Sequence, residues 1–179
     1  MSGGLRLKVG LLYARFHFRK RRDPVVRFTE SVDRARKALV LLPESVTDSE
    51  SMQSVMKYLG RRFGLGSLTV IARDDLVSPL RTSFSGKTIT YSPEDINRWR
   101  IPRGELLRKM KSSTFDIALD LNVNLALPSA FICRESNAPL RVGFAKPEGD
   151  HFYNFVVQTR MTTNTPVAYK NLLKCLEMF

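Results

Sequence analysis

The chain has 179 residues, 43% of them hydrophobic, which suits one soluble globular domain or one domain plus a tail. No stretch approaches the roughly 20 consecutive apolar residues of a membrane-spanning helix, and charges among the first apolar positions argue against a secretory signal. The net charge of +12 is uneven, because residues 1–40 hold eleven basic and three acidic side chains and residues 41–179 hold eighteen and fourteen.

The first segment, LRLKVGLLYARFHFRKRRDPVVRF, predicts a helix that ends in a basic run before Asp23-Pro24. The apolar positions near one face of this helix are Leu5, Val9, Leu12 and Phe16. Three interpretations stay open: a helix packed on the body with a solvated basic end, a helix in the interface of an anionic membrane, and a nucleic-acid arm. In the last two, the partner would contact Arg15, Arg19, Lys20, Arg21 and Arg22.

The rest of the chain predicts strands that alternate with helices. Strands are expected at residues 37–43, 67–73, 87–92, 115–122, 140–146 and 154–160. Helices are expected at residues 49–64, 93–99, 103–113, 125–137 and 165–179, with a loop-rich segment at 74–86. This alternation implies right-handed crossovers, so the expected fold is α/β, a three-layer Rossmann-like sandwich with a mostly parallel sheet. We therefore expect a basic arm over residues 1–36 and one domain over residues 37–179.

Familiar cofactor and metal motifs are missing from the sequence. The turn after the first strand, PESVTD, holds no glycine for a dinucleotide phosphate, and no Walker A motif is present. The two histidines, His17 and His151, lack metal-ligand spacing, and no nucleophile elbow precedes His151. Cys133 and Cys175 lie in apolar-patterned segments, so we expect free, buried thiols. The sequence thus predicts no cofactor and no metal.

Polar side chains follow two of the predicted strands. Asp48 follows the first strand, and Asp120 and Asn122 end the fourth. Carboxyl ends of parallel strands meet at the edge where open α/β sheets bind ligands. Asp48 also stands where a helix N-cap is expected, a role that stabilises a helix by about 1 kcal/mol and needs no further function. Both interpretations of Asp48 stay open.

Two segments together resemble a known family. KALVLLPESVTDSESMQSVMKYLGRRFG and FDIALDLNVNLALPSAFICRESNAPLRVGF are similar to the N-terminal half of the heptosyltransferase-type glycosyltransferases, the ninth glycosyltransferase family. The likeness covers roughly residues 37 to 160. Thr47-Asp48 stands in the place of a Gly-Asp pair, and Ser54 stands where that family has a proline.

The resemblance implies one half of a two-domain GT-B-type fold, the half that binds the acceptor sugar-lipid. It makes Asp48 the general base. Thr47 precedes Asp48 in the loop after the first strand, so we expect it at the ligand-binding edge with Asp120 and Asn122. We expect the donor-binding half to be missing, and glycosyl transfer depends on positioning of the donor. The expected function is therefore a non-catalytic glycosyltransferase-like binding module.

The predicted partner binds through residues 1–24. It is an anionic membrane surface, a nucleic acid or a protein assembly, and the expected location is the cytoplasm, with the inner face of the membrane as one binding place. Two alternatives stay open. One is an acceptor half that works with a separate donor-binding chain, and the other is an RNA- or ribosome-associated protein.

Overall fold

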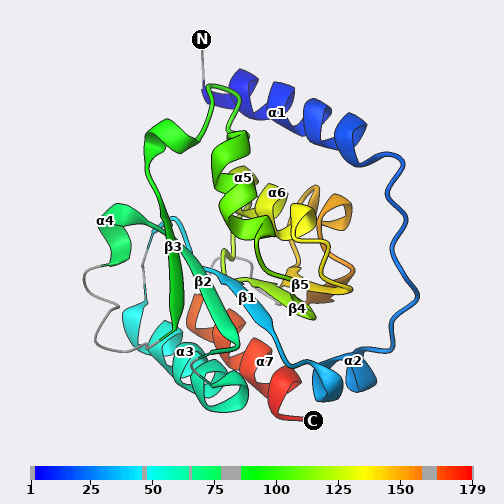
Figure 1. Ribbon diagram of the computed structural model, residues 1–179, viewed down its shortest axis with the longest axis vertical. Coiled ribbons are helices and arrows are strands. Elements are labelled where there is room, and N and C mark those ends of the chain that lie inside the picture. Colours follow the sequence, from blue (N-terminus) through cyan, green and yellow to red (C-terminus); the bar gives the residue numbers. More distant parts are fainter. Residues whose placement is uncertain (1–2, 46–47, 65, 78–85, 159–164, 179) are drawn as a thin grey trace.

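The centre of the molecule is a sheet of six parallel strands in the order β3-β2-β1-β4-β5-β6 (Figure 1). The fold is known from a computed structural model that describes residues 3–45, 48–64, 66–77, 86–158 and 165–178. The strands are β1 Ala38–Leu41, β2 Leu68–Arg73, β3 Lys87–Tyr91, β4 Ile117–Asp120, β5 Leu140–Phe144 and β6 Phe155–Val157. With helices on both faces, the sheet confirms the predicted α/β, Rossmann-like three-layer sandwich.

Helices cover the two faces of the sheet. Those of the described chain are α1 Gly3–Phe18, α2 Phe28–Arg34, α3 Ser49–Phe63, α4 Asp74–Val77, α5 Gly104–Lys111, α6 Leu127–Glu135 and α7 Thr165–Glu177. Short 3-10 turns lie at Pro93–Asp95 (η1) and Gly149–His151 (η2). Helices α2, α3 and α7 pack on one face, and α5 and α6 pack on the other. Helix α1 lies outside α6, at the top of the view in Figure 1.

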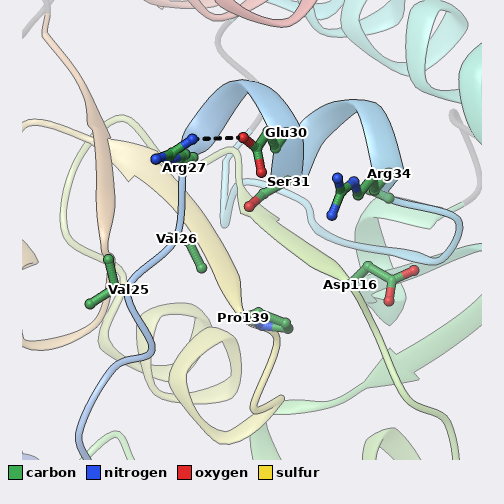
Figure 2. A pocket seen from close by; sticks show the side chains of 9 residues that line it. Val25, Val26, Arg27, Glu30, Ser31, Arg34, Asp116 and Pro139 are labelled. Carbon is green, nitrogen blue, oxygen red and sulfur yellow. Dashed lines mark hydrogen bonds and ion pairs between the residues drawn. The ribbon is translucent and has the colours of Figure 1, made fainter.

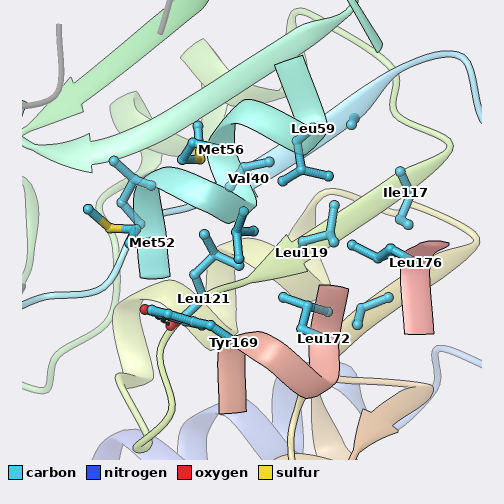
Figure 3. Close-up of a cluster of buried hydrophobic side chains, with 14 of the residues drawn as sticks. Val40, Met52, Met56, Leu59, Ile117, Leu119, Leu121, Tyr169, Leu172 and Leu176 are labelled. Atoms are coloured by element: carbon cyan, nitrogen blue, oxygen red, sulfur yellow. Dashed lines mark hydrogen bonds between the residues drawn. The ribbon is translucent and has the colours of Figure 1, made fainter. Parts of the chain in front are cut away.

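Each face of the sheet has its own hydrophobic core, and β1 contributes to both. Alternate strand residues point to opposite faces, so Ala38 and Val40 join one core and Leu39 and Leu41 the other. This is why β1 is a continuous apolar run. Figure 3 shows the core beneath α3 and α7, formed by residues that include Val40, Met52, Met56, Leu59, Ile117, Leu119, Leu121, Tyr169, Leu172 and Leu176.

Most predicted elements are confirmed, and two details differ. Helix α2 was not predicted, because only Val32 of its seven residues is buried and its pattern is short. The helix expected at residues 93–99 is only the turn η1. The Asn97 side-chain oxygen accepts hydrogen bonds from the backbone N–H groups of Trp99 and Ile101, which competes with helix formation.

Helix α1 packs on the body through its face with small residues. The buried side chains Ala14 and Phe18 lie on the inner face, and the exposed side chains Leu12 and Phe16 lie on the outer face. Gly10 explains this choice, because a Cβ atom there would lie 2.1 Å from the Trp99 backbone oxygen. Small residues let the helix approach the body closely along this face, and the larger apolar side chains of the other face are left outside.

Candidate functional site

The end of β4 lies at the point where the strand order reverses. Strand β1 pairs with β2 on one side and with β4 on the other, and Leu41 is level with Asp120. In open α/β sheets this switch point, outside the carboxyl ends of the strands, is the usual place for a ligand. The structure therefore brings the predicted Asp120 and Asn122 to the expected edge.

The Asp120 carboxylate lies in a closed polar network. The side chain of Asp120 is 1% exposed. Its Oδ1 accepts hydrogen bonds from the Asn122 backbone N–H (3.0 Å), the Asn122 amide (2.7 Å) and the Ser129 hydroxyl (2.9 Å). Its Oδ2 accepts one from the Tyr153 hydroxyl, and the Lys146 ammonium lies 3.6 Å away. Burial, together with the charge of Asp120, raises the pKa of Tyr153, so Tyr153 remains a neutral donor.

Asn122 extends this network to the loop after β1. Its side-chain oxygen accepts a hydrogen bond from the Glu44 backbone N–H (2.9 Å), and its amide also donates to the Leu42 carbonyl (3.2 Å). The sequence showed that both Asp120 and Asn122 follow a strand, but their partners Ser129, Lys146 and Tyr153 come from distant segments and were missed. With its oxygens engaged and buried, Asp120 is placed to hold β1, β4 and α6 together.

Asp48 is the N-cap of α3. Its Oδ1 accepts a hydrogen bond from the Ser51 backbone N–H (3.2 Å), which satisfies one of the free donors at a helix start. Its other oxygen, Oδ2, is buried and has no hydrogen-bond partner within the described chain. The capping interpretation of Asp48 is confirmed, and its role as a general base stays a prediction. The neighbouring Thr47, predicted at the same edge, lies outside the described residues.

A hollow of about 420 Å³ lies at the opposite, amino-terminal edge of the sheet (Figure 2). Several of its polar groups are already engaged. Arg27, at the N-cap position of α2, pairs with Glu30 of that helix at 3.1 Å, and the Asp116 carboxylate accepts hydrogen bonds from the backbone N–H groups of Arg36 and Lys37. These groups do not converge on a common point, so we assign no ligand to this hollow.

The outer face of α1 is apolar and open to solvent. Large exposed hydrophobic side chains gather there: Leu5 is 48% exposed, Leu12 63% and Phe16 62%. Basic residues flank this apolar stripe, and no acidic residue occurs in the chain before Asp23. Within the part of the chain that the structure describes, Arg6, Lys8, Lys20 and Arg22 form no ion pair. The face thus combines apolar area with uncompensated positive charge.

The five predicted anion-binding residues divide into two groups. Arg15 pairs with Glu148 at 2.5 Å, and Arg21 pairs with Glu135 at 2.9 Å, so intramolecular contacts occupy both. The second group has no acidic partner in the described ranges and consists of Arg19, Lys20 and Arg22. The Arg19 guanidinium lies 3.9 Å from the centre of the Phe16 ring.

Buried charges fasten the end of α1 to the body. Asp23 pairs with the arginines Arg134 of α6 and Arg141 of β5, which are 7% and 3% exposed. The buried Glu135 carboxylate binds Arg21, His17 (2.5 Å) and Lys111 (2.5 Å). The sequence analysis missed these contacts; the one signal was the charged pair Arg134-Glu135 at the end of an apolar helix.

The fold and these contacts define a Rossmann-like α/β protein with a closed switch point and a basic helix on its outside. A family described as a family of unknown function (DUF6913) matches residues 15–179, so the chain belongs to that family. No curated protein and no solved structure matched the chain. Among the described residues, no helix is both long and apolar enough to span a membrane, and no cluster of side chains has the makeup of a metal site.

Proposed function

We propose that this protein is a non-catalytic, glycosyltransferase-like binding module that attaches to an anionic lipid surface through α1, at the inner face of the membrane. The observation that carries this proposal is the outer face of α1, where Leu5, Leu12 and Phe16 are exposed beside unpaired basic residues. Exposed apolar patches rimmed by polar residues mark interaction sites. Helices with an apolar face and flanking Lys and Arg lie in the interface of anionic membranes.

The apolar stripe favours lipid over nucleic acid. A nucleic-acid surface gains from phosphate contacts and from aromatic rings that stack on bases, and Leu5 and Leu12 supply neither. Burial of a leucine side chain in the acyl boundary gains about 1.5–3 kcal/mol when it is complete. Each basic residue near an anionic leaflet adds about 1 kcal/mol. Lipid is the partner that uses both properties of this face.

The sheet edge supports a non-catalytic interpretation. Glycosyl transfer requires an acid or base that can reach a sugar hydroxyl. The Asp120 oxygens already accept hydrogen bonds from three side chains, and Asp48 caps a helix with one oxygen. The alternative of an acceptor half that works with a separate donor chain rests on the remaining oxygen of Asp48 and would require a partner protein.

Vesicle sedimentation tests the proposal. The wild-type protein should sediment with vesicles of phosphatidylcholine plus phosphatidylserine and less with phosphatidylcholine alone. The double substitution Leu12→Glu and Phe16→Glu should weaken binding by at least about tenfold per residue, because apolar burial is lost and negative charge is added. Stability should be retained, since both side chains are exposed.

Met178→Glu is the matched control. Met178 is 71% exposed, and it follows α7, which packs on the sheet face opposite to α6 and α1. Equal binding of the double variant and the control would contradict the proposal. Salt-sensitive binding to RNA without binding to vesicles would instead support the RNA-associated alternative.

A further inference from the structure

A cavity of about 260 Å³ opens over the carboxyl ends of β1, β2 and β3. It is distinct from the Asp120 network and from the outer face of α1. The polar side chains among its lining residues are Glu44, Arg73, Tyr91, Asn97 and Arg100. Its volume is just below the roughly 300–1,000 Å³ of small-molecule sites, so it suits a ligand much smaller than a dinucleotide.

Three consecutive strands deliver one polar group each to this cavity. Arg73 and Tyr91 are the last residues of β2 and β3 and lie level with each other, and Glu44 follows β1 in the loop that Asn122 holds. Because the strands are parallel, all three groups lie at the edge where such sheets bind ligands. The cavity is therefore built by the sheet itself.

The fourth polar group, Arg100, is held by a strained turn. Its φ is +63°, a conformation that L-residues other than glycine rarely adopt. The Asn97 side chain accepts hydrogen bonds from Trp99 and Ile101, and the Arg100 backbone N–H donates to the Asn97 carbonyl (2.9 Å). Such strain persists where the surroundings enforce it, and it is concentrated at functional sites.

The chemistry of the cavity fits an anion. The Arg100 guanidinium donates to the Glu44 carboxylate at 3.2 Å, but both side chains are partly exposed, so the pair is weak and open to exchange. Arg73 donates to Asp75 and lies against the Glu44 carbonyl. Arginine forks match phosphate and carboxylate groups.

The Tyr91 hydroxyl is a neutral hydrogen-bonding group in this cavity. The Tyr91 side chain is 7% exposed, and its hydroxyl makes no hydrogen bond with the residues that the structure describes. Pro128, in the first turn of α6, borders the cavity, and no side chain caps the start of that helix. Once an anion binds Arg100, the Glu44 carboxylate is free to accept a hydrogen bond from a ligand hydroxyl.

We propose that this cavity binds a small phosphate monoester that also carries hydroxyl groups. The phosphate binds Arg100, displacing Glu44 from its ion pair, and binds Nη1 of Arg73, the nitrogen that does not bond to Asp75. Glu44 and Tyr91 then bind the hydroxyl-bearing part. The assignment does not depend on membrane attachment, because no α1 residue lines the cavity.

Calorimetric titration of the intact protein tests the proposal. Glycerol 3-phosphate is the probe, and inorganic phosphate and glycerol are the comparison compounds. Glycerol 3-phosphate is expected to bind most tightly and glycerol not to bind. Arg100→Gly should weaken binding at least tenfold while the melting temperature is kept or raised, because glycine accepts the positive φ without strain.

Arg98→Gly is the matched control, since it removes the same charge from the same loop and does not line the cavity. Equal binding by the Arg100→Gly and Arg98→Gly proteins would overturn the proposal, as would the absence of glycerol 3-phosphate binding to the wild type. Equally tight binding of inorganic phosphate would overturn the assignment of a hydroxyl-bearing ester. Loss of vesicle binding in α1 variants with glycerol 3-phosphate binding intact would show that the two sites are independent.

Discussion

The carboxylate of Asp48 supports the start of α3 through a single hydrogen bond to the Ser51 N–H. Asp48→Ala removes this acceptor and should lower the free energy of unfolding by about 1 kcal/mol, whereas Asp48→Asn should be nearly neutral, because asparagine caps about as well. Urea unfolding of the three proteins measures the difference. Equal stability of the alanine variant and the wild type would show that the cap contributes nothing.

The same pair of variants addresses the predicted role of Asp48 as a base. Asparagine keeps the cap and removes the proton acceptor. If a transfer activity is found with a donor-binding partner, an Asp48→Asn protein of unchanged stability and lost activity would support the glycosyltransferase alternative. Unchanged activity would exclude Asp48 as the base.

Single residues could be predicted from the sequence only as far as their place along the chain. The position of Asp120 at the end of a strand placed it at the sheet edge, and the position of Asp48 before a helical pattern indicated a cap. The partners of Asp120 could not be predicted, because Ser129 reaches it through the packing of α6, and Tyr153 reaches it from the segment between η2 and β6. The ion pairs of Arg15 and Arg21 also join residues more than a hundred positions apart.

Helix α1 depends on a close approach to the body at Gly10. A methyl group at this position would lie 2.1 Å from the Trp99 backbone oxygen and 2.7 Å from a Leu127 methyl carbon. Gly10→Ala should therefore push α1 outward and lower the free energy of unfolding by about 1–3 kcal/mol. Thermal or urea unfolding checks this expectation.

Gly60→Ala is the control for that substitution. Gly60 lies inside α3, and a Cβ atom there would have no atom within 4 Å apart from its chain neighbours and the backbone of its own helix. This variant should gain about 0.5–1 kcal/mol, because alanine favours the helix over glycine. A gain of similar size in Gly10→Ala would mean that α1 does not press on Trp99 as described.

Elements were predictable where one face or both faces of a segment are buried. A short apolar run, as in β1 and β4, indicates a strand that is buried on both faces. Helical spacing of apolar residues indicates α3, as in Met52, Met56 and Leu59. Helix α1 has apolar residues on two faces, so periodicity could not identify the inner one. The packing partner decides between them, and Gly10 and Ala14 are the small residues that admit it.

Glu135 connects α1, α5 and α6 and makes the whole molecule sensitive to acid. Burial alone would raise the pKa of Glu135, but hydrogen bonds from Lys111 and His17 and the charge of Arg21 outweigh it, so the pKa is lowered from its usual 4.5. A carboxyl with a lower pKa in the folded state contributes stability above its unfolded-state pKa. That contribution is lost as the pH falls through the folded-state value.

Glu135→Gln should lower the free energy of unfolding by about 1–3 kcal/mol at neutral pH, since hydrogen bonds to a charged group are lost. The difference from wild type should shrink as the pH falls below 4.5. Urea unfolding over this range tests both statements, with Glu94→Gln as the control, because Glu94 is exposed. A difference that stays constant with pH would show that the charge of Glu135 is not the cause.

The attachment of α1 to α6 also has a consequence for synthesis of the chain. Arg21 and Arg134, which join the two helices, are 113 positions apart. Helix α1 therefore leaves the ribosome long before its packing partner exists, with its inner residues Ala14 and Phe18 and its outer residues Leu12 and Phe16 all uncovered. Exposed apolar surface of this kind invites aggregation. Helix α1 is thus made well before the helix on which it packs, and its apolar surface stays exposed for that interval.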